Sequence, residues 1–298
     1  MSAADPVAAA NRSGTVPAPR RRRTFRAVPV ILLALLAAIL LVGVFADWLA
    51  PHAAEATSLR NRLKPPFWME RGSSVNLLGT DDQGRDILSR IIFGTRVSLA
   101  VGFFAVLGAG SIGIALGVMA GYLGGKIDAV IMRITDAATA VPLILVALLF
   151  VVTLGQSFVN VILALMILLW SRYTRVIRSE VLSLKERDFV ILARVAGCSH
   201  MSIVVRHIFP NVVNTAVVLF TLQVGIVILV EATLSFLGAG VPPPTPAWGS
   251  MVAEGRDYIA TEWWIAFFPG MAIMVTVLTF NLAGDWLRDR FDPKLRQL

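Results

Sequence analysis

Five long stretches without a charged residue decide what this chain of 298 residues can fold into. The hydrocarbon core of a bilayer is about 30 Å thick, and roughly 20 apolar residues of helix are needed to cross it. A soluble domain usually carries about a quarter charged residues, whereas this chain carries 15%. The composition therefore predicts an all-α integral membrane protein. The uncharged stretches cover residues 28–46, 97–125, 137–171, 208–230 and 263–284.

The third stretch is long enough for one overlong helix or for two spans joined by a turn. Turn-forming residues occur at 154–160, among them Gly155 and Asn160. With a turn there and the N-terminus in the cytoplasm, 19 Lys and Arg residues face the cytoplasm and 8 face outside. A single helix would place most of them outside. Because cytoplasmic loops carry the excess of Lys and Arg, the sequence predicts six spans with both termini cytoplasmic.

This topology divides the chain into segments of different character. The core of five later helices includes a cytoplasmic loop at 182–210. The predicted segments are a disordered, basic cytoplasmic tail at 1–27, the first transmembrane helix at 28–48, an external loop and interfacial segment at 49–92, the transmembrane core at 93–287 and a cytoplasmic C-terminal tail at 288–298.

Small residues mark one face of the second span, and tryptophans mark the outer loops. Gly113, Gly117 and Gly121 are spaced four apart, so they line one helix face against which another helix can pack closely. The outer loops combine prolines, which stiffen them, with tryptophans, which commonly lie at the lipid headgroups. An interfacial position is therefore expected for Trp68, Trp248, Trp263 and Trp264.

The stretch "DFVILARVAGCSHMSIVVRHIFPN" runs from Asp188 to Asn211 and begins with a helix that cannot span a membrane. The ten residues 187–196 would form about 15 Å of helix, half the thickness of a membrane core, with charges on both sides. They carry an apolar stripe at Phe189, Leu192, Ala193 and Ala196. Gly197 is a predicted helix stop, Ser199 a helix N-cap, and Pro210 fits the first turn of the next span. The pattern predicts two short cytoplasmic helices that meet at a glycine turn; the alternative is an ordinary interfacial connector.

This segment resembles the EAA loop of ABC importer permeases. In that pattern an acidic-Ala-Ala triplet is followed by a glycine and, thirteen residues later, by a proline. Gly197 and Pro210 have this separation, and Ala193 matches the third position of the triplet. Ile191 and Leu192 occupy the first two positions, so the acidic residue of the pattern is absent.

Three further blocks resemble the C-type permease subunit of the dipeptide/oligopeptide/nickel ABC importer family. They are "LLGTDDQGRDILSRIIFGTRVSLAVG" at 77–102, "EATLSFLGAGVPPPTPAWGSMV" at 231–252 and "NLAGDWLRDRFDPKLR" at 281–296. Their occurrence together and in this order is more specific than any one of them alone. Together with the loop, they cover most of residues 75–298.

The resemblance implies a type I importer permease that forms half of a translocation path in the bacterial plasma membrane. It also implies a homologous permease as partner, two ATP-binding subunits that bind ATP and Mg, and an external solute-binding protein. Peptides are the default substrate, although similar permeases handle opines, glutathione, nickel complexes and sugars. The residues expected to couple to the ATPase are Asp188, Ile191, Leu192, Ala193, Arg194, Gly197 and Pro210.

Other chemistry is poorly supported by the sequence. The nearest candidate for a phosphate-binding loop, "AGYLGGKI" at 120–127, lacks the required Gly and Ser/Thr, so ATP must be bound on another subunit. No Ser–His pair or aspartate pair indicates an intramembrane protease, and three scattered histidines predict no metal site. The net charge of +8 is spread between apolar runs, which indicates topology rather than binding of nucleic acid.

An ion-coupled secondary transporter is the alternative function. Such a carrier would need ionisable residues within the membrane or two related halves. Glu231 is the one charged residue inside a predicted span, and Gln223 lies on the same broad face of that helix. These two side chains are expected either to line the path or its outer gate, or to form a structural contact at the helix end.

Overall fold

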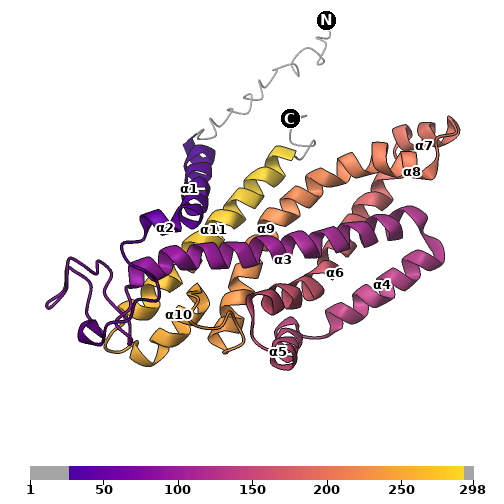
Figure 1. Ribbon diagram of the computed structural model, residues 1–298. Coiled ribbons are helices and arrows are strands. Elements are labelled where there is room, and N and C mark those ends of the chain that lie inside the picture. Colours follow the sequence, from indigo (N-terminus) through magenta and orange to yellow (C-terminus); the bar gives the residue numbers. More distant parts are fainter. Residues whose placement is uncertain (1–26, 292–298) are drawn as a thin grey trace, which may run out of the picture.

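The computed structural model describes residues 27–291, and this part of the chain is helical, with one isolated β-bridge between Thr80 and Asp86 (Figure 1). The prediction of an all-α protein is confirmed for that range. Most of the two predicted tails, 1–27 and 288–298, lies outside it. The main helices are α1 (Ala27–Val44), α2 (Ala46–Leu49), α3 (Ile87–Leu123), α4 (Gly125–Ala140), α5 (Leu143–Leu154), α6 (Phe158–Leu184), α7 (Asp188–Val195), α8 (His200–Ile203), α9 (Phe209–Phe236), α10 (Trp248–Gly255) and α11 (Trp264–Phe291).

Four helices in the described range are long and apolar enough to cross a membrane: α3, α6, α11 and the continuous helix that α8 and α9 form together. A fifth crossing is added if α4 and α5, which are bent by 85° at the break between them, count as one broken span. The apolar part of α1, Val30–Val44, is shorter. At 1.5 Å per residue it is only about 22 Å long. The six-span count is therefore not confirmed, although the chain does turn at 154–160, between α5 and α6.

Two spanning helices extend beyond their uncharged stretches. α3 begins at Ile87, where the N-cap residue Asp86 accepts a hydrogen bond from the Ser89 amide at 2.8 Å. α6 continues past residue 171 to Leu184. Arg172, Arg175 and Arg178 therefore lie on a helix long enough to span a membrane.

The glycine face of α3 packs against α6, which identifies the neighbour that the sequence could not name. A Cβ atom at Gly117 would lie 2.9 Å from Ile177 Cβ, and one at Gly121 would lie 2.8 Å from Val181 Cβ. Both distances are shorter than ordinary carbon contacts. The absence of side chains at these positions thus sets how closely α3 and α6 approach each other.

The segment that joins α2 to α3 gathers with α10 at one end of the bundle, opposite α7 and α8 (Figure 1). A buried cluster of ion pairs, which the sequence analysis did not predict, connects them. Arg85 bridges Asp81 at 2.6 Å and Glu254 of α10 at 2.9 Å, and Arg90 bridges the same two carboxylates. The cluster ties α10 to the segment that joins α2 to α3; we call these two elements the outer cap, after the external side predicted for them.

Tryptophans of the outer cap are placed differently from the interfacial prediction. Trp248 is 1% exposed and donates its indole N–H to the Ile91 carbonyl at 3.0 Å. Trp264 is also buried, and its indole N–H donates to the Thr80 carbonyl at 3.3 Å. These two rings hold the outer cap to α3 and α11 instead of lying in the headgroup region. The Trp68 and Trp263 rings are exposed.

Arg96 of α3 bonds to the end of α1 and to α2. Arg96 donates to the carbonyl groups of Gly43 and Val44 at 3.0 and 3.1 Å, and to the Asp47 carboxylate at 2.8 Å. The carbonyls at the end of α1 are thereby satisfied by a positive charge, which is favourable at a helix C-terminus. The hydrogen bond from Arg96 also lowers the pKa of Asp47.

Candidate functional site

Two cavities follow one another along α6 and α9. The first, of about 830 Å³, lies where α4 gives way to α5 and is bounded by α6 and α9. The second, of about 690 Å³, lies nearer to α7 and is bounded by α6, α9 and the end of α11. Val176 of α6 lines both, so the two cavities are neighbours on the same side of the bundle. We call them together the α6–α9 groove.

A ladder of arginines on α6 faces α4 and then the groove. Arg178 is bonded to Asp128 at 2.5 Å, and Arg175 is bonded to Asp136 at 2.9 Å. These pairs hold α4 against α6. Arg172 lies one turn before Arg175 on α6, level with the α4–α5 break. It makes no side-chain hydrogen bond or ion pair within residues 27–291.

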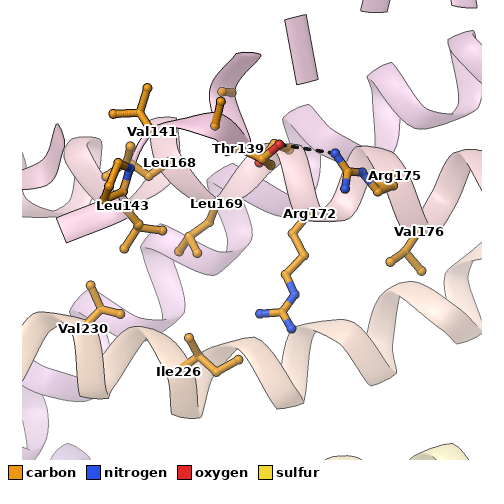
Figure 2. A pocket seen from close by; sticks show the side chains of 14 residues that line it. Thr139, Val141, Leu143, Leu168, Leu169, Arg172, Arg175, Val176, Ile226 and Val230 are labelled. Carbon is orange, nitrogen blue, oxygen red and sulfur yellow. Dashed lines mark hydrogen bonds between the residues drawn. The ribbon is translucent and has the colours of Figure 1, made fainter. Parts of the chain in front are cut away.

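Figure 2 shows that Arg172 extends from α6 across the first cavity toward α9, where Ile226 lies. Arg175 points instead toward Thr139 of α4, to which it donates at 3.3 Å. The remaining lining of this cavity is apolar or uncharged and contains no carboxylate. A cavity with apolar walls and a few polar groups is typical of a small-molecule site, and this one favours anions.

The two residues predicted for the path or gate lie outside both cavities. Gln223 is 2% exposed and Glu231 is fully buried, on the side of α9 that packs against α3. The Ser235 hydroxyl donates to Glu231 at 2.7 Å. Burial against α3 favours the structural interpretation of this carboxylate, while Ile226 and Val230 of the same helix line the first cavity. Whether Glu231 has a role in gating stays a prediction.

The segment after α6 has the predicted helix–glycine–helix form. Gly197 follows α7 with a φ of +77°, the left-handed conformation that glycine adopts without steric cost. The Gly197 amide donates to the Arg194 carbonyl, and the Cys198 amide donates to the Ala193 carbonyl, both at 3.1 Å. This is the pattern of a Schellman helix end. Ser199 then caps α8 by accepting from the Ser202 amide at 3.3 Å.

The apolar residues of α7 divide between two faces. Val190 and Ala193 are buried against the bundle. Ile191, Leu192 and Val195 are exposed, with Leu192 at 66% and Val195 at 80%. The expected stripe at Phe189, Leu192, Ala193 and Ala196 therefore does not form a single buried face, and of these four side chains Ala193 alone turns inward. The charged Asp188 and Arg194 are exposed as well.

The second helix of the segment is not a separate element. α8 continues through a π-helical turn, Val204–Ile208, directly into α9. Pro210 lies in the first turn of α9, as predicted, but the helix does not stop before it. The π turn precedes the position where the missing proline N–H removes a backbone bond, and the Asn211 side chain donates to the His207 carbonyl at 2.7 Å. The Tyr122 hydroxyl, next to the end of α3, is 2.9 Å from His200 Nδ1.

A family model described as "Binding-protein-dependent transport system inner membrane component" matches residues 113–297. This range contains the α6–α9 groove and the segment at 188–211 in full. The chain belongs to this family. The prediction of a permease subunit without catalytic function is thereby confirmed.

Curated members of this family match nearly the whole chain. The dipeptide transport system permease protein of Escherichia coli K12 is 43% identical over 87% of this chain and 86% of its own length. The di/tripeptide transport system permease protein of Pseudomonas aeruginosa is 40% identical over 87% of this chain and 85% of its own. The dipeptide transport system permease protein of Alkalihalophilus pseudofirmus is 41% identical over 90% and 86%.

Membership of the family carries two further conclusions. The chain is a multi-pass component of an inner membrane, and it works in a system that depends on a binding protein. An ion-coupled secondary transporter, the alternative left open by composition, does not fit this family. The cluster of Asp81, Asp82 and Glu254 is not evidence for a metal site, because Arg85 and Arg90 already neutralise it.

Sequence reasoning missed the arginines of the groove. The charge count placed Arg172, Arg175 and Arg178 among the residues that face the cytoplasm, because they follow the end of the uncharged stretch at 171. A signal was present in their spacing of three, which places them on one side of a helix, and in the matching carboxylates at Asp128 and Asp136. Helical spacing of charges on two neighbouring segments indicates paired helices rather than a loop.

Proposed function

We propose that this chain is one of the two permease subunits of an ATP-driven importer of short peptides in a bacterial inner membrane. The second permease is a homologous chain, two further subunits bind ATP and Mg, and an external protein delivers the solute. Both termini of this chain are cytoplasmic. The peptide substrate is supported by three relatives, permease proteins of dipeptide or di/tripeptide transport systems, that are 40–43% identical over most of their length.

The α6–α9 groove supports the assignment of half a translocation path. It runs from the end of the bundle where α7 lies to the level of the α4–α5 break, about halfway along α6. A groove along the side of a helical bundle becomes a closed passage when a second bundle covers it. The homologous permease supplies that second wall.

The exposed apolar face of α7 is the observation that carries the ATP-driven function. Ile191, Leu192 and Val195 project from a short helix at the end of the bundle, beyond the spanning part of α6. Such a face, flanked by Asp188 and Arg194, is typical of a site where another protein docks. We assign it to the ATP-binding subunit and call α7, Gly197 and α8 the coupling segment.

Replacing Leu192 with aspartate tests this assignment. The side chain is 66% exposed, so the charge is tolerated by this chain alone. In the docked complex the charge would be buried without a partner, at a cost of several kcal/mol. Leu192→Asp is expected to abolish co-purification of the ATP-binding subunits and ATP-dependent uptake in liposomes. Ala193→Asp is less informative, because Ala193 is buried inside this chain.

Leu59→Asp is the matched control, because Leu59 is also an exposed leucine, at 84%, but belongs to the outer cap. It is expected to leave attachment of the ATP-binding subunits unchanged. If Leu192→Asp retains both attachment and uptake at the level of Leu59→Asp, the segment at 188–211 is only a connector and the proposed docking site is wrong.

A further inference from the structure

Arg172 differs from the other arginines of its ladder in having no carboxylate opposite it. Arg178 and Arg175 each meet an aspartate of α4. α4 ends at Ala140, and the chain bends away by 85° into α5, which has no acidic residue. The bend therefore leaves Arg172 facing the open first cavity in the part of the chain that the structure describes.

An arginine in this position is costly unless it faces water or an anion. Arg172 lies near the middle of α6, fourteen residues from its start and twelve from its end. Fourteen residues of helix are about 21 Å long, less than the roughly 30 Å of a membrane core. Charged residues inside spans almost always face a water-filled cavity or the bundle interior, and they mark the pathways of substrates and ions. Figure 2 shows the guanidinium of Arg172 directed into the cavity, toward α9.

The charge of the cavity has one sign. The charged residues that line it are Arg172 and Arg175. Arg175 is already paired with Asp136, which does not line the cavity. The other walls are formed by side chains such as Leu143, Leu169 and Val230. They carry no group that binds an anion, but they can pack against an apolar side chain of a solute. The cavity has a volume of about 830 Å³ and thus combines one available guanidinium with largely apolar walls.

We infer that Arg172 binds the carboxylate of the solute as it passes along the α6–α9 groove, an inference that rests on the proposed function. The guanidinium presents a planar fork of N–H donors that pairs with both oxygens of a carboxylate. A short peptide carries such a group at its C-terminus, and its side chains fit against the apolar walls. Arg172 is therefore a binding residue for small solutes that carry a free carboxylate.

The alternative partner for the Arg172 guanidinium is an acidic side chain of the second permease. The two cases differ in one respect: an ion pair between subunits is independent of the solute, whereas a solute site is protected by a free acid and not by its amide. The test therefore measures protection directly on the purified transporter, without the external binding protein, so that the selectivity of that protein does not enter.

The reporter is a cysteine at the neighbouring position 176. Val176 lies one helical turn from Arg172 and lines both cavities. Val176→Cys is introduced together with Cys198→Ser, because Cys198 is the one cysteine of this chain and is exposed. The rate at which an uncharged maleimide modifies this subunit is then measured with increasing dialanine or dialaninamide.

Dialanine is expected to slow modification, and dialaninamide is not. Adding Arg172→Gln should raise the dialanine concentration for half protection by about tenfold or more, the factor that corresponds to ~1.4 kcal/mol for a charged hydrogen bond. Arg172→Lys should retain part of the protection. The matched control is Arg133→Gln, which removes an exposed arginine of α4 that lines neither cavity; it should leave protection unchanged.

Three results would overturn the inference: no protection by dialanine, equal protection by the amide, or full protection with Arg172→Gln. Any of them assigns Arg172 to structure or to the partner permease. The same preparation is assayed for attached ATP-binding subunits and for ATP-dependent uptake. Loss of those with protection intact would refute the proposed function and leave the carboxylate site standing.

Discussion

The close contact between α3 and α6 allows a stability prediction whose magnitude follows from the structure. Gly117→Ala adds a Cβ atom that would lie 2.9 Å from both Ile177 Cβ and the Thr174 carbonyl oxygen. Ordinary carbon contacts are about 3.5–4.0 Å, so the two helices must separate by roughly 0.6–1 Å. Overpacking of this kind typically costs about 1–3 kcal/mol.

Gly270→Ala is the matched control for this change. A Cβ atom there meets no atom within 4 Å, and the residue lies within α11. Both substitutions gain the same helix propensity, about 1 kcal/mol for alanine over glycine. The difference between them therefore isolates the contact with α6, and Gly117→Ala should be less stable than Gly270→Ala by about 1–3 kcal/mol.

Thermal unfolding of the two variants in the same detergent measures this difference. In domains of 150–250 residues 1 kcal/mol shifts the Tm by roughly 2–4 °C, so Gly117→Ala should melt at least about 2 °C below Gly270→Ala. Gly117→Val, with two more carbon atoms at the contact, should melt lower still. A Tm for Gly117→Ala equal to or above that of Gly270→Ala would show that the glycine face does not set the helix separation.

Two further predictions concern topology and the buried carboxylate. Cys198 is exposed in this chain but lies in the segment proposed to contact the ATP-binding subunit. In intact cells an impermeant thiol reagent should leave it unlabelled, and in inside-out vesicles stripped of the ATP-binding subunits it should react; labelling in intact cells would contradict the cytoplasmic assignment. Glu231 is fully buried and bonded to Ser235, so Glu231→Gln should keep ATP-dependent uptake within about twofold, because an amide accepts the same hydrogen bond. A protonophore at constant ATP should not change uptake by the unmodified protein or by Glu231→Gln. A loss of uptake with the protonophore would favour coupling to protons.

The sequence predicted those features that depend on local patterns. The Schellman end at Gly197, the cap at Ser199 and the turn at 154–160 follow from residue types that act within a few positions of themselves. The match of the glycine spacing on α3 to a close helix contact is of the same kind. Such signals need no knowledge of the rest of the chain.

Features that depend on distant partners were not predicted. The ends of α3 and α6 lie beyond the uncharged stretches, where Arg90 and Arg178 meet carboxylates far away in sequence, and a count of charges along the chain treats paired and unpaired residues alike. The break between α4 and α5 was not predicted either, because a bent span has the same composition as two ordinary helices. The burial of Trp248 depends on a carbonyl of α3 that no local pattern reveals.

The unbroken passage of α8 into α9 has a mechanical consequence. From His200 to Phe236 the chain is one continuous helix, about 55 Å long at 1.5 Å per residue. One end belongs to the coupling segment, the flank forms a wall of the groove, and the far end touches the outer cap, where a Cβ atom at Gly249 would lie 2.5 Å from Ala232 Cα. The proposed docking site, the groove wall and the cap contact therefore share one helix, and a tilt of that helix would displace all three together.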